Sequence, residues 1–254
     1  METWLIIGTR SPYRYPKTAS STQTRLSIKM LSAMILAAGR GRRLAPITDK
    51  TPKPLLEVGG KTLIDHHLDA LIEAGITHVV VNVAHLSDQI VKHLRSVNPG
   101  SIEVVISEEP PDALETGGGI LQALDKIKSD PFLVLNGDVL TDLDLSSLPD
   151  QIEDLAHLIL VANPVHHPRG DFVLDGDRLR ALADKKDPAT LTYAGIGVYR
   201  KAFFSGCAPG RFGLGPLLKK AARENRLSGS LYEGRWIDIG TPERLKAARA
   251  TGHR

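Results

Sequence analysis

Two hydrophobic patterns alternate along the chain, and this alternation constrains the fold more than any other feature of the sequence. Short apolar runs at Ala33–Ala37, His78–Val83 and Phe132–Leu135 are typical of buried parallel strands. Segments with helical spacing lie between them; Leu63–Ala74, for example, keeps its apolar residues on one face and is followed by Gly75. Strands that alternate with helices form a parallel sheet covered on both faces, because the crossovers are right-handed. The sequence therefore predicts an α/β fold with a Rossmann-like, doubly wound and mostly parallel sheet.

The second half of the chain departs from this alternation. Strands are expected at Leu155–Val161 and Thr190–Tyr199, and Asp175–Asp177 is expected to turn a hairpin between them. A closing helix should begin after Thr241, a good N-cap residue, with Pro242 at its first position. These elements predict a small β insertion in the same domain.

The composition supports one domain and excludes several classes of protein. The chain has 254 residues and 42% hydrophobic content, so residues 30–254 suit a single α/β domain with a sizeable core. No apolar run reaches the ~18 residues that a membrane-spanning helix requires. The single cysteine, Cys207, excludes an internal disulfide and a cysteine-rich zinc site, and it favours a reducing cytoplasm.

Residues 1–29 differ in composition from the rest of the chain. They are rich in Ser, Thr and Arg, and they hold the basic excess behind the net charge of +3. Because this excess belongs to the tail, it gives no argument for nucleic-acid binding. The composition resembles a transit peptide, but Met30 stands just before the first predicted strand. We therefore expect a disordered tail or a mis-assigned start, with Met30 as the true first residue.

The stretch from Leu36 to Leu55 carries the clearest chemical signal. A strand runs into a loop with glycines at positions 39 and 41, followed by Arg43 and then by Lys53 between two prolines. Glycine lets backbone N–H groups approach an anion, and the arginine and lysine supply positive charge to phosphate oxygens. The spacing matches neither a P-loop, G-x-x-x-x-G-K-[ST], nor a dinucleotide fingerprint, G-x-G-x-x-G. A structural turn with solvated arginines is the alternative interpretation.

The full string, G-x-G-x-R followed by P-K-P, resembles the signature of the sugar-1-phosphate nucleotidylyltransferases. The resemblance implies that Arg43 and Lys53 are the catalytic cations. It also implies nucleotide contacts from the end of the strand and from the loop, at Leu36, Ala38, Gly39 and Gly41. One departure is Arg42, at a position where the family leads us to expect an acidic residue.

Two aspartates follow apolar strands in distant parts of the chain. Asp138 ends the motif N-G-D after Phe132–Leu135, and Asp238 lies in W-I-D-I-G. Ligands of open parallel sheets lie beyond the carboxyl ends of the strands, and carboxylates there can hold Mg²⁺. An aspartate that caps a loop is the alternative for the first motif alone. The resemblance assigns Asp138 and Asp238 to a Mg²⁺ pair and gives Asn136 a role in substrate binding.

Three glycines at 117–119 follow Glu115 at the start of a predicted helix. Glycines at a helix N-terminus leave backbone N–H groups free for a ring or a phosphate, whereas the alternative is a flexible N-cap. In the family this loop packs on the nucleobase and ribose. We therefore expect nucleotide contacts at Glu115, Gly117 and Gly118. Glu108 and Glu109 precede the loop and are expected to reach the base.

The segment H-H-P-R-G-D-F, residues 166–172, is the most distinctive part of the second half. Adjacent histidines in an extended loop point in opposite directions, and no nearby cysteine or H-x-x-x-H completes a zinc site. A sugar-binding loop is the favoured interpretation, because Asp171 can accept from hydroxyls and Arg169 can meet a carboxylate or phosphate. Gly195, in a neighbouring strand, would let the sugar ring lie against the backbone.

The resemblance extends from about Met34 to Leu245 and implies transfer of UMP from UTP to a sugar 1-phosphate, with release of pyrophosphate. The later motifs most resemble those of family members that act on N-acetylmuramate 1-phosphate, and this resemblance implies that sugar and a cytoplasmic role in cell-wall recycling. Mannose, glucose or heptose 1-phosphate with GTP or dTTP is the alternative enzyme. A catalytically inactive nucleotide-sugar sensor is the non-enzyme alternative. The expected partners are small substrates rather than nucleic acid or membrane, and the oligomeric state is left open.

Overall fold

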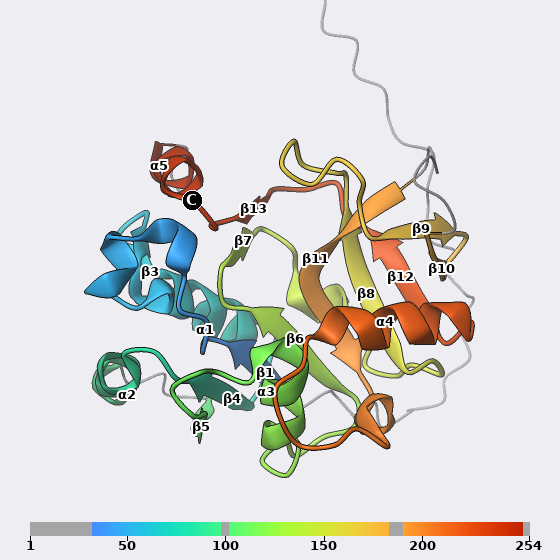
Figure 1. Ribbon diagram of the computed structural model, residues 1–254, viewed down its shortest axis with the longest axis horizontal. Helices are drawn as coiled ribbons and strands as arrows, with labels where there is room; N and C mark the ends of the chain where they lie inside the picture. The colour runs from blue at the N-terminus through green and yellow to red at the C-terminus, as the bar shows by residue number, and fades with distance from the viewer. Residues whose placement is uncertain (1–31, 98–101, 183–189, 251–254) are drawn as a thin grey trace, which may run out of the picture.

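The computed structural model describes residues 32–97, 102–182 and 190–250 (Figure 1). The expectations for residues 1–29 and for Met30 lie outside these ranges. Within them, one nine-stranded sheet runs in the order β5-β4-β1-β6-β11-β8-β12-β10-β9. The described residues contain no helix that is long and apolar enough to cross a membrane.

The first half of the sheet is parallel, as the sequence predicts. It comprises β5 (Glu103–Glu108), β4 (His78–Val83), β1 (Ser32–Leu36) and β6 (Phe132–Asn136). All residues of β4 and all but the last residue of β1 are buried, which explains their nearly continuous apolar sequence. The carboxyl ends of β1 and β6 lie side by side, since Leu36 pairs with Asn136.

The second half of the sheet is mixed, and most of its pairings are antiparallel. It comprises β11 (Thr190–Tyr199), β8 (Ala156–Val161), β12 (Leu227–Leu231), β10 (Arg178–Ala181) and β9 (Phe172–Asp175). β11 runs antiparallel to both β6 and β8, whereas β12 is parallel to β8. The predicted hairpin is β9–β10, and it extends this sheet. The sequence analysis missed β12, because its Ser-Gly-Ser centre has no apolar pattern.

Helices cover both faces of the parallel half. α1 (Leu63–Glu73) and α2 (Ser87–Ser96) pack on the face that includes Ile35, whereas α3 (Glu115–Ala123) and α4 (Leu214–Arg223) share a core with Met34. Adjacent side chains of β1 point to opposite faces, so one strand contributes to both cores. This arrangement is the doubly wound α/β fold that the sequence predicts.

A third, smaller core lies at one corner of the molecule. There α5 (Pro242–Ala250) buries Leu245 in a cluster with Leu44 and Ile239. The corner also holds β7 (Val139–Thr141), which pairs antiparallel with β13 (Trp236–Asp238). The remaining short elements are β2 (Glu57–Val58), β3 (Lys61–Thr62) and single 3₁₀ turns at Arg42–Leu44, Ile47–Asp49, Lys53–Leu55, Leu145–Ser147 and Lys201–Phe204. The two predicted acids and the loop after β1 (residues 37–55, called the phosphate loop below) lie together beyond the carboxyl ends of β1 and β6.

Candidate active site

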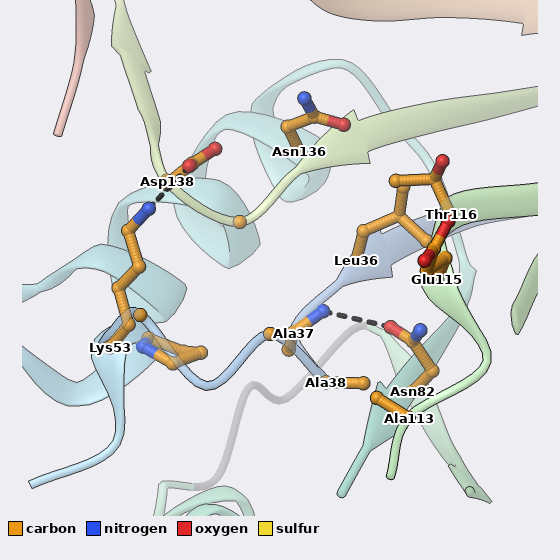
Figure 2. Close-up of a pocket in the computed structure, with 14 residues that line it drawn as sticks. Leu36, Ala37, Ala38, Lys53, Asn82, Ala113, Glu115, Thr116, Asn136 and Asp138 are labelled. Carbon is orange, nitrogen blue, oxygen red and sulfur yellow. Dashed lines mark hydrogen bonds and ion pairs between the residues drawn. The ribbon is translucent and has the colours of Figure 1, made fainter. Parts of the chain in front are cut away.

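A cavity opens at the carboxyl ends of β1 and β6, and most of the predicted nucleotide residues line it (Figure 2). It is lined by Leu36, Ala37, Ala38, Gly39, Gly41, Lys53, Pro54, Asn82, Ala113, Glu115, Thr116, Asn136, Gly137 and Asp138. The loop after β1, the turn after β6 and the start of α3 thus surround one space. We call it the nucleotide cavity.

The loop after β1 is held in a tight corner. Gly41 has a φ of 65°, and a Cβ there would lie 3.0 Å from Cγ2 of Thr48. The Thr48 hydroxyl donates to the carbonyl oxygen of Gly41 at 2.9 Å, and Nε2 of His85 lies 2.9 Å from the carbonyl oxygen of Thr48. The second glycine of the motif is therefore needed for a left-handed turn that neighbouring segments fix in place.

Lys53 reaches across the cavity to the turn after β6. Its ammonium group forms an ion pair with Oδ2 of Asp138, as Figure 2 shows, and the lysine side chain is only 13% exposed. Pro52 and Pro54 restrict the backbone on either side of the lysine, where a 3₁₀ turn begins. A largely buried cation beside the turn is suited to an anionic ligand.

Asn82, at the end of β4, is a cavity residue that the sequence analysis missed. Its Oδ1 accepts from the N–H of Ala37 at 2.8 Å, and its Nδ2 donates to Oε1 of Glu109 at 2.6 Å. The other carboxylate oxygen of Glu109 accepts from the N–H of Leu114 at 2.7 Å. Glu109, expected to reach the base, is thus used to hold the loop before α3, and neither it nor Glu108 lines the cavity. A polar residue at the end of a buried strand was the available signal for Asn82.

The three glycines of α3 differ from the expectation. The helix already begins at Glu115, and the N–H groups of Gly117 and Gly118 both donate to the carbonyl oxygen of Phe212 at 3.0 Å. A Cβ on Gly118 would lie 2.1 Å from the carbonyl oxygen of Gly210. Gly117 and Gly118 therefore serve close packing against residues 210–213 rather than contact with the cavity, which Glu115 and Thr116 line instead.

The two predicted metal acids lie on neighbouring segments. Asp238 pairs with Val139 in the β7–β13 ladder, and the N–H of Ile239 donates to the carbonyl oxygen of Asp138 at 2.8 Å. Two acids that are a hundred positions apart in the sequence are thus joined through their backbones. The two segments that carry the acids are therefore adjacent.

The carboxylate of Asp238 has one oxygen engaged and one free. Its Oδ2 accepts from Arg244 at 2.9 Å, whereas its Oδ1 is buried and has no hydrogen-bond partner in the described part of the chain. An unpartnered buried carboxylate oxygen is costly unless it meets a cation or a donor. No group of three or more His, Cys, Asp or Glu side chains forms a ligand set in the described ranges. The donor set fits a hard cation that takes its other ligands from phosphates and water.

A second cavity, of about 390 Å³, adjoins the first at Asn136 and Asp138. It is lined by Arg43, Asn136, Asp138, Val139, His166, His167, Thr192, Tyr193, Ala194, Gly195, Trp236 and Asp238. Its volume lies in the range of small-molecule sites. Both acids and Arg43 face it, and so do Gly195 and the two histidines of the loop that the sequence analysis expected to bind the sugar. We call it the acceptor cavity, after the expected sugar acceptor.

The loop of residues 164–171 contributes to this cavity through its histidines and not through its arginine. Arg169 is exposed and is absent from the lining of each described cavity. His166 lines the cavity, and its Nε2 contacts the guanidinium group of Arg244. The structure thus places His166, with Arg244 behind it, where the sequence analysis expected Arg169.

Asp171 and Gly195 are both held by internal contacts. Asp171 accepts from the N–H of Tyr193 at 2.9 Å and pairs with His167 at 3.0 Å, and it lines a third hollow next to α4. Gly195 has a φ of 75°, and a Cβ there would lie 2.6 Å from Nδ2 of Asn136. The absence of a side chain at Gly195 therefore leaves room for the side chain of Asn136 at the wall of the acceptor cavity.

Arg244 is a further residue that the sequence analysis did not single out. It lies in the first turns of α5 and contacts both Asp238 and His166. A Cβ on Gly240 would lie 2.2 Å from its guanidinium group and 3.0 Å from that of Arg43. The only local signal for Arg244 was its place at the start of the helix that follows the strand of Asp238.

The fold and this double cavity agree with the comparison with known families. A family model described as "Nucleotidyl transferase" matches residues 32–253. The chain belongs to this family. It is a nucleotidyltransferase, and the resemblance seen in the phosphate loop is confirmed.

Two relatives extend over nearly the whole described chain. The N-acetylmuramate alpha-1-phosphate uridylyltransferase of Neisseria meningitidis is 47% identical over 87% of this chain and 97% of its own length. The protein of the same name from Caulobacter vibrioides is 36% identical over 86% of this chain and 95% of its own length.

Solved structures share the fold at lower identity. HddC from Yersinia pseudotuberculosis, in complex with GMP-PN, has a TM-score of 0.70 at 23% identity and covers 87% of this chain and 99% of its own. The inositol-1-phosphate CTP transferase from T. maritima has a TM-score of 0.71 at 19% identity, with 89% and 98% covered. These likenesses confirm the α/β fold class.

Proposed function

We propose that the protein transfers UMP from UTP to N-acetylmuramate 1-phosphate and releases pyrophosphate. The observation that carries the proposal is the junction of the two cavities at Asn136 and Asp138, with Lys53 on one side and Arg43 on the other. A nucleotide in the first cavity and a sugar phosphate in the second would bring their phosphates together at this junction. The choice of uridine and of the muramate sugar is supported by the names of the two relatives that match over almost their full length.

The reaction needs alignment and positive charge more than it needs a general base. The phosphate of the acceptor is ionised near neutral pH, so it can attack the α-phosphorus of UTP directly and expel pyrophosphate in line. Two like charges ~4 Å apart repel by about 4 kcal/mol at an effective dielectric constant near 20. Lys53 and Arg43 offset this repulsion, and the rigid turn after β6 holds the reacting groups in register.

A divalent cation, Mg²⁺, is part of the proposal. Asp138 and Asp238 would hold it, because the free Oδ1 of Asp238 and the oxygen-only donor set suit a hard cation. When bound, the cation would supply charge stabilisation to the phosphates. A cytoplasmic role in cell-wall recycling follows as a proposal from the same substrates.

The inositol-1-phosphate CTP transferase shares the fold, so a different acceptor and base are the second candidate. A nucleotide-sugar sensor is disfavoured, because Arg43, Lys53 and both aspartates are present and face the cavities. The deciding experiment is a matrix of UTP, GTP, dTTP and CTP against 1-phosphates of N-acetylmuramate, N-acetylglucosamine, glucose, mannose and heptose. Pyrophosphate release is the readout. We expect UTP with N-acetylmuramate 1-phosphate to give the highest kcat/KM; a higher value for another pair would replace the substrate assignment.

A further inference from the structure

A buried histidine of α1 lies directly beneath the turn that carries Asn136 and Asp138. His67 is 6% exposed and lies on the buried face of the helix. The backbone of Asn136 and Gly137 lies within hydrogen-bonding reach of its ring, and Nδ1, unlike Nε2, is not among the buried atoms without a partner. The ring therefore contacts the residues on either side of the junction between the two cavities without lining either cavity itself.

The other ring nitrogen of His67 points to a separate small space. Nε2 is buried and has no hydrogen-bond partner in the described part of the chain. A cavity of about 30 Å³ lies beside the ring; most of its wall is apolar, and His66 and Thr141 add polar groups to that of His67. A space above ~10–15 Å³ with a polar wall can hold one water molecule. One bound water would satisfy Nε2 and leave Nδ1 to hold the turn.

Burial keeps this ring uncharged. Desolvation lowers the pKa of His67 to about 4, and the nearby carboxylate of Asp138 offsets only part of this effect. Near neutral pH the ring is therefore a neutral donor to the backbone. It does not compete with Lys53 for the charge of Asp138.

The opposite side of the same turn is fixed by β1. The N–H of Gly137 donates to the carbonyl oxygen of Leu36 at 3.0 Å, and a Cβ on Gly137 would lie 2.6 Å from that oxygen. The turn is thus held between the end of β1 on one side and His67 on the other. The N–H of Ile239 also donates to the carbonyl oxygen of Asp138, so His67 is the contact that the turn makes on the side of α1.

We propose that His67 is a positioning residue for nucleotidyl transfer. It holds the turn at 136–138 in the position that lets Asp138 contact Lys53 and lie beside the reacting phosphates. This role rests on the proposed function for the reaction, whereas the contact with the turn does not. A displacement of catalytic groups by about 1 Å can lower the rate about 100-fold. We therefore expect a loss in kcat and in cation affinity rather than a loss in the KM for UTP.

Two amide variants of matched chemistry test the contact. In His67→Asn the amide lies near the position of Nδ1, and in His67→Gln it lies near Nε2. We expect His67→Asn to retain kcat within about threefold and His67→Gln to lose about 10- to 100-fold. Each variant is also titrated with Mn²⁺ alone by electron paramagnetic resonance, which needs no substrate. The dissociation constant should rise several-fold only in His67→Gln.

His78 provides a matched control in the same sheet. It is 3% exposed, both of its ring nitrogens are buried without a partner in the described ranges, and burial lowers its pKa as well. It begins β4, at the opposite end of the strands from the cavities. His78→Gln should lose stability without loss of kcat or of Mn²⁺ affinity.

Equal kcat and equal Mn²⁺ affinity in His67→Asn and His67→Gln would overturn the proposal. So would a His78→Gln variant that loses both properties to the same extent as His67→Gln. If the wild type transfers nucleotides to a different sugar, the same comparison is made with that sugar. If it transfers none, the proposed function fails, while the Mn²⁺ titration still decides whether His67 positions Asp138.

Discussion

Lys53 and Asp138 form an ion pair that joins the segment after the phosphate loop to the turn after β6. Asp238 forms a similar pair with Arg244 at 2.9 Å. Each acid at the junction of the cavities is therefore matched by its own cation. Incoming phosphates and a divalent ion would exchange partners with groups that are already in place, so little reorganisation is needed at the moment of reaction.

Lys53 should be essential for turnover. We expect Lys53→Ala to lower kcat/KM by about 100-fold or more, because it removes a largely buried charge aimed at the phosphates. Lys50→Ala is the control, since Lys50 is exposed and lines neither cavity. Steady-state pyrophosphate release measures both. Near wild-type activity in Lys53→Ala would remove the lysine from the mechanism.

Adjacent arginines allow a sharp test of the motif. Both arginines are exposed, but only Arg43 lines the acceptor cavity, whereas Arg42 lines neither cavity. We expect Arg43→Ala to lose about 100-fold in kcat/KM and Arg42→Ala to lose less than threefold, because only the first removes charge from the reacting phosphates. Equal effects in the two variants would mean that the motif supplies a general positive field and no specific contact.

The two acids should be needed for a metal-dependent rate and not for folding. Asp138→Asn and Asp238→Asn keep the shape of the side chain but remove the charge that a hard cation requires. We expect the wild type to be inactive in excess chelator and both variants to stay inactive at saturating Mg²⁺, with thermal unfolding showing a folded protein. Full wild-type activity in excess chelator would contradict the proposed cation site.

The sequence predicted those parts of the site that depend on local pattern. β1 with the phosphate loop, and β6 with the turn after it, are each continuous segments that their apolar runs and glycines define. Arg43, Lys53 and Asp138 could therefore be placed from the sequence. The role of Gly118 could not, because it depends on packing against Gly210, about ninety positions later. The positions of Arg169 and Arg244 depend on the path of a loop and on the docking of α5, which short-range patterns do not encode.

Gly118 should matter for stability first. A Cβ there would lie 2.1 Å from the carbonyl oxygen of Gly210, so Gly118→Ala should cost at least about 2 kcal/mol of the free energy of unfolding. Gly215→Ala is the control within α4, because its added Cβ would meet no atom within 4 Å apart from its chain neighbours and its own helix backbone, and alanine favours helix. It should be neutral or stabilising by less than about 1 kcal/mol. Urea unfolding measures both, and equal stabilities would show that residues 210–213 can move away.

The acceptor cavity should read the carboxylate of the muramate sugar through His166. Arg244 is permanently protonated and donates to Nε2 of His166, which leaves the Nδ1–H of the ring as a donor beside the cavity. A hydrogen bond to a charged group contributes about 1.5–3 kcal/mol, or about 10- to 150-fold in preference.

N-acetylmuramate 1-phosphate and N-acetylglucosamine 1-phosphate differ by the lactyl ether that bears this carboxylate, so the ratio of their kcat/KM values isolates the contact. We expect His166→Ala to reduce that ratio by about tenfold. Arg169→Ala, at an exposed position outside the described cavities, should leave the ratio unchanged. The reverse result, with Arg169 controlling the ratio, would mean that the loop of residues 164–171 folds over the sugar when it binds.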